Sequence, residues 1–275
     1  MSDAADVRKV VILAAGLGKR MRQPAGDARL AALQAAAADT GVKALIPFAR
    51  PFLDYSLSAL ADAGFREACL VIGPQHQQIR DYYMQERPPR RLKIFFAVQS
   101  QPRGTADALL AAREFTQDEL FLMINSDNYY PVSACRAARK MRGPGIIVFE
   151  RDALLHRGNI QPERISGFAA VKVAPCGQLD DVLEKPSPET IRALGPRVWL
   201  SMNCWLFDKR IFPACERIGP SPRGELEIPD AVRLAIHELA VRFEVTRCAD
   251  PVLDLSSRRD IESIAPFLER LPVNL

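Results

Sequence analysis

Two glycines and two cations directly follow an apolar run near the start of the chain, and together they could bind phosphate. The run at residues 10–15 is rich in β-branched residues, which indicates a buried strand. Glycines at 16 and 18 let backbone N–H groups approach an anion, and Lys19 and Arg20 supply charge that a triphosphate needs. No Ser or Thr follows Lys19 as in a Walker A loop, and Met21 replaces the third glycine of a GxGxxG loop. The segment predicts a phosphate-binding loop, with a structural glycine turn as the alternative.

A polar cluster, residues 125–128, follows the apolar run at residues 120–124. A carboxylate at a strand end beside a triphosphate can hold Mg²⁺, a hard cation that takes few protein ligands along with phosphate oxygens and water. Asp127 is therefore a candidate metal ligand. Asn, Asp and Ser are also ordinary turn residues, so a turn without a metal remains open.

Apolar runs and helix-length amphipathic stretches alternate through the first 150 residues. The strands are expected at residues 69–72, 94–98, 120–124 and 146–149, and the helices at residues 53–63, 105–115 and 133–141. This alternation is typical of an α/β fold with a mostly parallel sheet covered by helices on both faces. Ligands of such sheets bind beyond the carboxyl ends of the strands, where the glycine loop and Asp127 lie.

The second half of the chain changes rhythm but is expected to continue the same sheet, giving one domain over residues 1–275. Short strands are predicted at residues 168–173, 182–184 and 199–207, and helices at residues 228–240 and 259–271. An alanine-rich stretch at residues 28–38 also favours a helix.

The composition excludes several classes of protein. The 275 residues are 48% apolar and 25% charged, as in a globular chain with a sizeable core. A formal charge of +4 is too balanced for a nucleic-acid or membrane surface, so neither partner is expected. The six cysteines form no CxxC pair, which indicates reduced thiols in the cytoplasm. Residues 1–6 lack the features of an export signal, and no apolar run reaches the roughly 20 residues that span a bilayer.

The glycine loop resembles the LxxGxGxRM signature of the sugar-phosphate nucleotidyltransferases, which include the glucose-1-phosphate thymidylyltransferases and uridylyltransferases. The resemblance implies a Rossmann-like, three-layer α/β fold with a mixed, mostly parallel sheet. It divides the domain into a nucleotide-binding half, residues 1–150, and a sugar-binding half, residues 151–275. It also implies that Arg20 binds the phosphates and that the loop backbone lies against base and ribose, at Leu13, Ala14, Ala15, Gly16 and Gly18.

Further segments of the first half are similar to the same family. Lys43-Ala-Leu-Ile-Pro resembles its K-x-L-x-P stretch, whose lysine contacts phosphate. The chain has extra residues between Arg20 and Lys43, which could form a lid or a surface ornament. Gln99, Gly104 and Thr105 match Q-x4-G-(T/L), and an amide can donate to O4 and accept from N3–H of uracil or thymine. The segment thus favours UTP or dTTP.

The second half contains the family's sugar-site elements in the same order. The resemblance places Gly167, Glu184 and Asn203 at the sugar, and Lys185 and Arg223 at the sugar phosphate. The segment around Asp254 resembles W-x-D-x-G-T, whose aspartate is a second Mg²⁺ ligand, although Val252 replaces the tryptophan and Ser-Ser replaces Gly-Thr.

The implied activity is transfer of a nucleotidyl group from UTP or dTTP to a sugar 1-phosphate, with release of pyrophosphate. Two rivals remain. A nicotinamide-dependent oxidoreductase needs an acidic ribose ligand about 20 residues after the loop, and Asp39 has that spacing but lies in the insertion. A non-catalytic relative would bind sugar nucleotide and regulate a partner, but Asp127, Arg20 and Lys185 are all present and favour an enzyme. The apolar C-terminal helix predicts either a homo-oligomer interface or a cap on its own domain.

Overall fold

The computed structural model describes residues 6–26, 28–195 and 197–275. The prediction that residues 1–6 carry no export signal concerns a segment of which residues 1–5 lie outside this range. Within it, a nine-stranded sheet has the central order β10-β6-β9-β4-β1-β2-β3, with β7 paired to β9 and β8 to β7. The strands are β1 (Lys9–Leu13), β2 (Glu67–Ile72), β3 (Lys93–Val98), β4 (Phe121–Asn125), β6 (Gly145–Glu150), β7 (Ala170–Val173), β8 (Leu179–Leu183), β9 (Trp199–Phe207) and β10 (Glu244–Cys248).

The sheet is mixed and mostly parallel along its central path. Strand β1 runs parallel to both β2 and β4, β2 to β3, and β6 to β10, whereas β9 is antiparallel to β4 and β6. The near-continuous apolar sequence of β1 fits a strand that is covered on both faces. The α/β prediction is confirmed. Strand β9 from the second half lies between β4 and β6 of the first.

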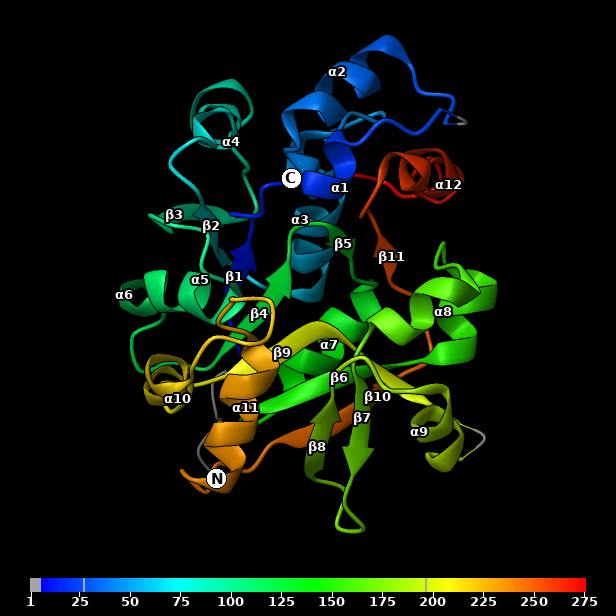
Figure 1. Cartoon of the computed structure of the whole chain (residues 1–275). Coiled ribbons are helices and arrows are strands. Elements are labelled where there is room, and N and C mark those ends of the chain that lie inside the picture. The colour runs from blue at the N-terminus through cyan, green and yellow to red at the C-terminus, as the bar shows by residue number, and fades with distance from the viewer. Residues whose placement is uncertain (1–5, 27, 196) are drawn as a thin grey trace.

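Helices cover both faces of the sheet (Figure 1). Val10 and Ile12 pack with α3 and α7, while Val11 between them packs with α5, α10 and α11, as the alternation of side chains along a strand requires. The helices are α1 (Lys19–Arg22), α2 (Ala32–Thr40), α3 (Phe52–Ala63), α4 (Gln77–Asp81), α5 (Thr105–Ala111), α6 (Arg113–Thr116), α7 (Val132–Lys140), α8 (Arg151–Arg157), α9 (Pro188–Ala193), α10 (Ile211–Arg217), α11 (Ile228–His237) and α12 (Arg258–Leu268).

Short elements complete the chain. They are the 3₁₀ turns η1 (Lys43–Leu45) and η3 (Pro162–Gly167), the π turn η2 (Tyr82–Glu86), and a two-stranded sheet of β5 (Asn128–Tyr129) and β11 (Leu253–Asp254). The single helix predicted over residues 105–115 is divided into α5 and α6 at Ala112, whose N–H bonds back to Leu109 in a tighter turn. None of the helices in the described ranges combines the length and apolar character needed to span a bilayer.

The extra segment after the glycine loop packs against the C-terminal helix. The alanine-rich helix is present as α2, two to four residues later than predicted, and Ala38 is buried in a third cluster with Met21 and Ile264. Arg258 of α12 pairs with Asp39 of α2. Figure 1 shows α1, α2 and α12 at one end of the molecule, opposite β7 and β8. Helix α2 therefore belongs to the packed structure around the loop.

Candidate functional site

The loop between β1 and α1 leaves the interior of the sheet at the carboxyl end of β1. Gly18 has a φ of +61°, and a Cβ at this position would lie 2.1 Å from the carbonyl oxygen of Gly41, so only glycine fits here. The backbone N–H groups of residues 15–18 donate to no group in the described part of the chain. A loop with several free N–H groups and two following cations provides what an anion needs.

A cavity of about 580 Å³ lies beyond the strand ends, and residues from both halves of the chain line it. All but two of the residues predicted for the site are part of this lining: Leu13, Ala14, Ala15, Gly16, Gly18, Arg20, Lys43, Gln99, Gly104, Thr105, Asp127, Gly167, Asn203, Arg223 and Asp254. The two that do not line it are Glu184 and Lys185. The structure thus brings together segments that are up to 241 positions apart, from Leu13 to Asp254.

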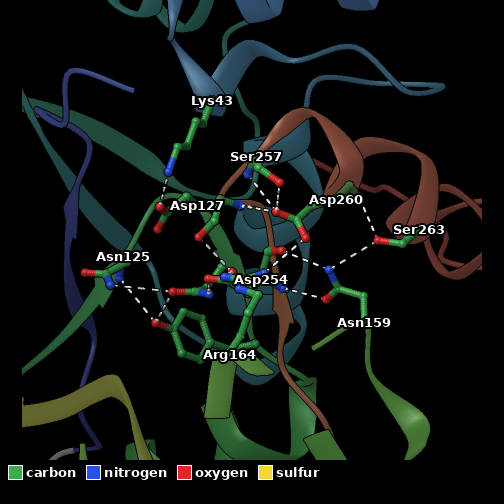
Figure 2. A network of polar contacts seen from close by, with 12 residues as sticks. Lys43, Asn125, Asp127, Asn159, Arg164, Asp254, Ser257, Asp260 and Ser263 are labelled. Carbon is green, nitrogen blue, oxygen red and sulfur yellow. Dashed lines mark hydrogen bonds and ion pairs between the residues drawn. The ribbon is translucent and has the colours of Figure 1, made fainter. Parts of the chain in front are cut away.

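Lys43 and Asp127 form an ion pair at the cavity wall. The Lys43 ammonium donates to Oδ2 of Asp127 at 2.8 Å, and Figure 2 shows the two side chains pointing toward each other. Burial opposes the charge of Lys43, but Asp127 and, more weakly, Asp254 outweigh it, and the pKa of Lys43 is raised. The positive charge of Arg20 acts on Lys43 in the opposite direction, so this predicted phosphate ligand is close by. Arg20 is exposed and pairs with no acidic side chain of the described residues.

Asp254 is buried below this pair, with 5% of its surface exposed. Its Oδ1 accepts from the Asn128 amide at 2.9 Å, and its Oδ2 accepts from Ser256 at 2.9 Å and from Arg164. Figure 2 shows Arg164 beside Asp254. Burial raises the pKa of Asp254, the negative charge of Asp127 raises it further, and Arg164 opposes both. The two carboxylates are therefore close enough to repel each other.

The donor set around Asp127 and Asp254 fits a magnesium ion. Both side chains line the cavity and offer carboxylate oxygens, and Oδ1 of Asp127 accepts no hydrogen bond within the described ranges. A divalent cation would relieve the repulsion that raises the pKa of Asp254. The described residues contain no group of three or more His, Cys, Asp or Glu side chains that could hold a metal by themselves. An ion here would thus depend on substrate oxygens and water, as Mg²⁺ commonly does.

Gln99 differs from the expected bidentate contact with a base. Its Nε2 donates to the Gly104 carbonyl at 3.0 Å and to Oδ2 of Asp107 at 2.8 Å. Both amide hydrogens are therefore used within the protein, and only Oε1 remains available to a ligand. The side chain lines the cavity but is 6% exposed, so its orientation is set by these neighbours.

Asn203 and Gly167 bring the second half of the chain to the cavity. Asn203 lies in β9 where the register with β6 shifts between Ile146 and Val148, and its φ is +55°. Bulges of this kind re-aim side chains and are common near binding sites, and Asn tolerates a positive φ better than most residues. Gly167 ends the 3₁₀ turn η3, and no atom lies within 4 Å of where its Cβ would be.

Arg223, Glu184 and Lys185 lie around a second acidic residue, Glu227. The Arg223 guanidinium bonds Glu227, with Nε 3.1 Å from Oε1, and therefore has an internal partner. Burial opposes ionisation of Glu227, but Arg223 and Lys185 outweigh it and lower its pKa. Burial and the charge of Glu227 raise the pKa of Glu184. These three predicted residues are thus close in space, although only Arg223 reaches the cavity lining.

Two polar residues that bear on the site were not predicted. Arg164 connects the Asp254 carboxylate to that of Asp260, whose Oδ1 lies 3.0 Å from its Nη1. Asp107 holds Gln99. Arg164 stands three positions before Gly167, and Asp107 lies inside the segment that contains Gln99, so proximity to predicted residues was the available signal.

The fold agrees with the comparisons to known proteins. Residues 9–250 match the model of the nucleotidyl transferase family, and the chain belongs to this family. The structure superposes on UDP-glucose pyrophosphorylase complexed with UDP-glucose, with a TM-score of 0.72 and 18% identity, over 96% of this chain and 100% of that one. At this identity, the likeness concerns the fold.

Several named nucleotidyltransferases are similar over most of this chain. A glucose-1-phosphate thymidylyltransferase of Streptomyces griseus is 30% identical over 230 residues, and a low-salt glycan biosynthesis nucleotidyltransferase of Haloferax volcanii is 27% identical over 236 residues. These matches cover 83% and 84% of this chain but 57% of each relative. A UTP–glucose-1-phosphate uridylyltransferase of Haloferax volcanii is 25% identical, over 83% of both chains.

Proposed function

We propose that the protein transfers a nucleotidyl group from UTP or dTTP to a sugar 1-phosphate, forming a nucleoside diphosphate sugar and releasing pyrophosphate. The observation that carries this proposal is the shared cavity. It joins the glycine loop, Gln99 and Asp127 of the first half to Gly167, Asn203 and Arg223 of the second. Two substrates that react with each other need adjoining sites, and family membership supports the same reaction class.

The reaction is an in-line displacement at phosphorus. A phosphate oxygen of the sugar 1-phosphate attacks the α-phosphorus of the triphosphate and forms a new P–O bond, while the bond from the α-phosphorus to the bridging oxygen breaks and pyrophosphate leaves. The nucleophile is an anion near neutral pH, so no general base is required. None of the three histidines lines the cavity, which is consistent with this mechanism.

Catalysis then depends on positioning and on charge neutralisation. Arg20, Lys43 and the N–H groups of residues 15–18 would hold the triphosphate, a role supported by their place at the cavity and by the lack of internal acceptors for these N–H groups in the described ranges. Arg223, after leaving Glu227, and Lys185 would hold the sugar phosphate, and Asn203 and Glu184 would bind sugar hydroxyl groups. Mg²⁺, held by Asp127 and Asp254, would neutralise charge on the phosphates.

The names of the relatives suggest which substrates to try first. Two of them are named for glucose 1-phosphate, one with a thymidylyl and one with a uridylyl group. UTP and dTTP carry the same donor and acceptor pattern on the base edge that Gln99 would face.

The proposal is tested by mixing purified protein and Mg²⁺ with each common nucleoside triphosphate and several hexose 1-phosphates, and by measuring pyrophosphate. We expect release with UTP or dTTP and at least one hexose 1-phosphate. The absence of pyrophosphate release for every pair would overturn the proposal. If nucleotide still bound in that case, the non-catalytic regulatory relative would be the better interpretation.

A further inference from the structure

Asp107 holds the Gln99 amide in a single orientation. Asp107 lies in the first turn of α5, is 9% exposed, and accepts from Nε2 of Gln99 at 2.8 Å. The second hydrogen of Nε2 goes to the carbonyl of Gly104 at 3.0 Å. A carboxylate and a carbonyl can only accept, so neither tolerates Oε1 in place of Nε2. Turning the amide over would place two acceptors against each other in a buried position.

The two acceptors are themselves fixed. Oδ1 of Asp107 receives Nε and Nη2 of Arg103 at 3.1 and 2.6 Å, which leaves Oδ2 for Gln99. Gly104 has a φ of +117°, and its Cβ position would lie 2.4 Å from the carbonyl oxygen of Leu226, so this backbone is held by close packing. The orientation of Gln99 is therefore set by the protein's own groups.

We propose that Asp107 is a positioning residue for base selection, an inference that rests on the proposed nucleotidyl transfer. With both hydrogens of Nε2 engaged, Gln99 presents the acceptor Oε1 to a base. Uracil and thymine have N3–H as the matching donor in the middle of their edge, whereas cytosine has a lone pair on N3. An acceptor facing that lone pair would leave two buried acceptors unpaired, which is costly.

Replacement of Asp107 by Asn tests this role. If the Asn oxygen still accepts from Arg103, its Nδ2 faces Gln99, and only the Gly104 carbonyl then favours the present orientation of the amide. The turned amide, with Nε2 toward N3 of cytosine, becomes accessible in this variant. We expect wild-type protein to prefer UTP over CTP by at least about tenfold, since one unsatisfied buried group costs that much or more. In Asp107→Asn, this ratio should fall at least about tenfold, mainly through weaker UTP binding.

The measurement has two parts, so that the inference and the proposed function can fail separately. One is the ratio of kcat/KM for UTP and CTP, from pyrophosphate release with one hexose 1-phosphate. The other is the ratio of the two Kd values, from calorimetry without sugar phosphate. If the wild type binds nucleotide but turns over no pair, the proposed function fails, while the Kd ratio still decides the role of Asp107.

A matched control exists on α3. Asp54 is also a buried helical aspartate with an arginine four positions before it, Arg50, and it accepts from two tyrosine hydroxyls away from the cavity. Asp54→Asn should leave the UTP to CTP ratio unchanged. Asp107→Ala, which frees one Nε2 hydrogen, serves as the second variant if Asp107→Asn does not fold. A wild type without preference, or a folded Asp107 variant with the wild-type ratio, would overturn the inference.

Discussion

The Lys43 ammonium lies 2.8 Å from the Asp127 carboxylate, although 84 positions separate them in the sequence. One was predicted to bind phosphate and the other to bind metal, so the structure pairs two groups that would have different partners during the reaction. The pair is part of the cavity wall, with 19% and 27% of the two side chains exposed. A triphosphate carrying a divalent cation could take over both groups, with phosphate at Lys43 and the cation at Asp127.

Asp127→Asn is expected to lower pyrophosphate release about 100-fold or more, because it removes the accessible carboxylate proposed to hold Mg²⁺ beside the phosphates. Stability should change little, since the ion pair is partly solvated. Steady-state turnover and a urea titration check both statements.

Asp180→Asn is the matched control, because Asp180 pairs with Lys172 at 2.7 Å outside the cavity. It removes one carboxylate from an ion pair of 2.7 Å, against 2.8 Å for the Lys43–Asp127 pair, and it should retain wild-type turnover. An Asp127→Asn protein that remained folded and fully active would contradict the assignment of Asp127.

Removal of divalent cations should abolish turnover, and added Mg²⁺ should restore it. Asp127 and Asp254 provide few protein oxygens, so the ion would be exchangeable and bound partly through substrate phosphates. Pyrophosphate release in EDTA, followed by a Mg²⁺ titration, measures this. Undiminished turnover in excess EDTA would show that the lysine and arginine side chains suffice.

Arg164→Met should destabilise the folded protein by roughly 3 kcal/mol, because Asp254 and Asp260 would lose the cation between two buried carboxylates. The free energy of unfolding from urea titrations gives the value. Arg151→Met is the control, since the Arg151–Asp152 pair is more exposed and should contribute less than about 1 kcal/mol. Equal effects of the two substitutions would show that Arg164 is not needed to balance the charges.

The parts of the site that follow strand ends could be predicted from the sequence. Apolar runs identified β1 and β4, and parallel strands place their carboxyl ends on one edge of a sheet, which brought the glycine loop and Asp127 together. The position of Asn203 also followed from motif order. Its bulged backbone did not, because a register shift depends on how β9 pairs with β6.

Side-chain partners could not be predicted in the same way. Arg164 contacts Asp254 across 90 positions, and its place three positions before Gly167 does not specify that contact. Gln99 was predicted as a base ligand, but which of its amide atoms remains free depends on Asp107, whose contact requires α5 to begin at Thr105. Such hydrogen-bond assignments depend on distances of a few tenths of an ångström, which residue types and spacing do not specify.

Gly18→Ala should destabilise the protein by about 1–2 kcal/mol and impair turnover, because Gly18 has a positive φ and no room for a Cβ beside Gly41. Gly16→Ala in the same loop is the control for stability, since no atom lies within 4 Å of its Cβ position and its φ is not positive. Thermal and urea unfolding of both variants give the comparison. Similar stabilities for the two would contradict the close contact between residues 18 and 41.

The free energy of unfolding should fall below about pH 6.5, because the folded protein holds His76 in a buried site that disfavours its protonation. It is 2% exposed, and its Nδ1 accepts the Gly73 N–H at 3.1 Å, a bond that requires an unprotonated Nδ1. Burial, and then the charge of Arg22, lower the pKa of His76 in the folded state. Below the pKa of about 6.5 that His76 has in the unfolded chain, the unfolded chain binds a proton on this side chain and the folded protein does not. The stabilising contribution is therefore complete above that pH and is lost as the pH falls from there toward the lowered folded pKa.

His76→Asn keeps an acceptor for Gly73 but cannot titrate, so its free energy of unfolding should fall less than that of the wild type between pH 6.5 and pH 5. His237→Asn, at an exposed histidine, should follow the wild-type curve. Urea titrations of the three proteins across this range give the difference directly. A wild type and a His76→Asn variant with parallel pH dependence would mean that the imidazole is protonated equally in the folded and unfolded states, which the buried Gly73 bond argues against.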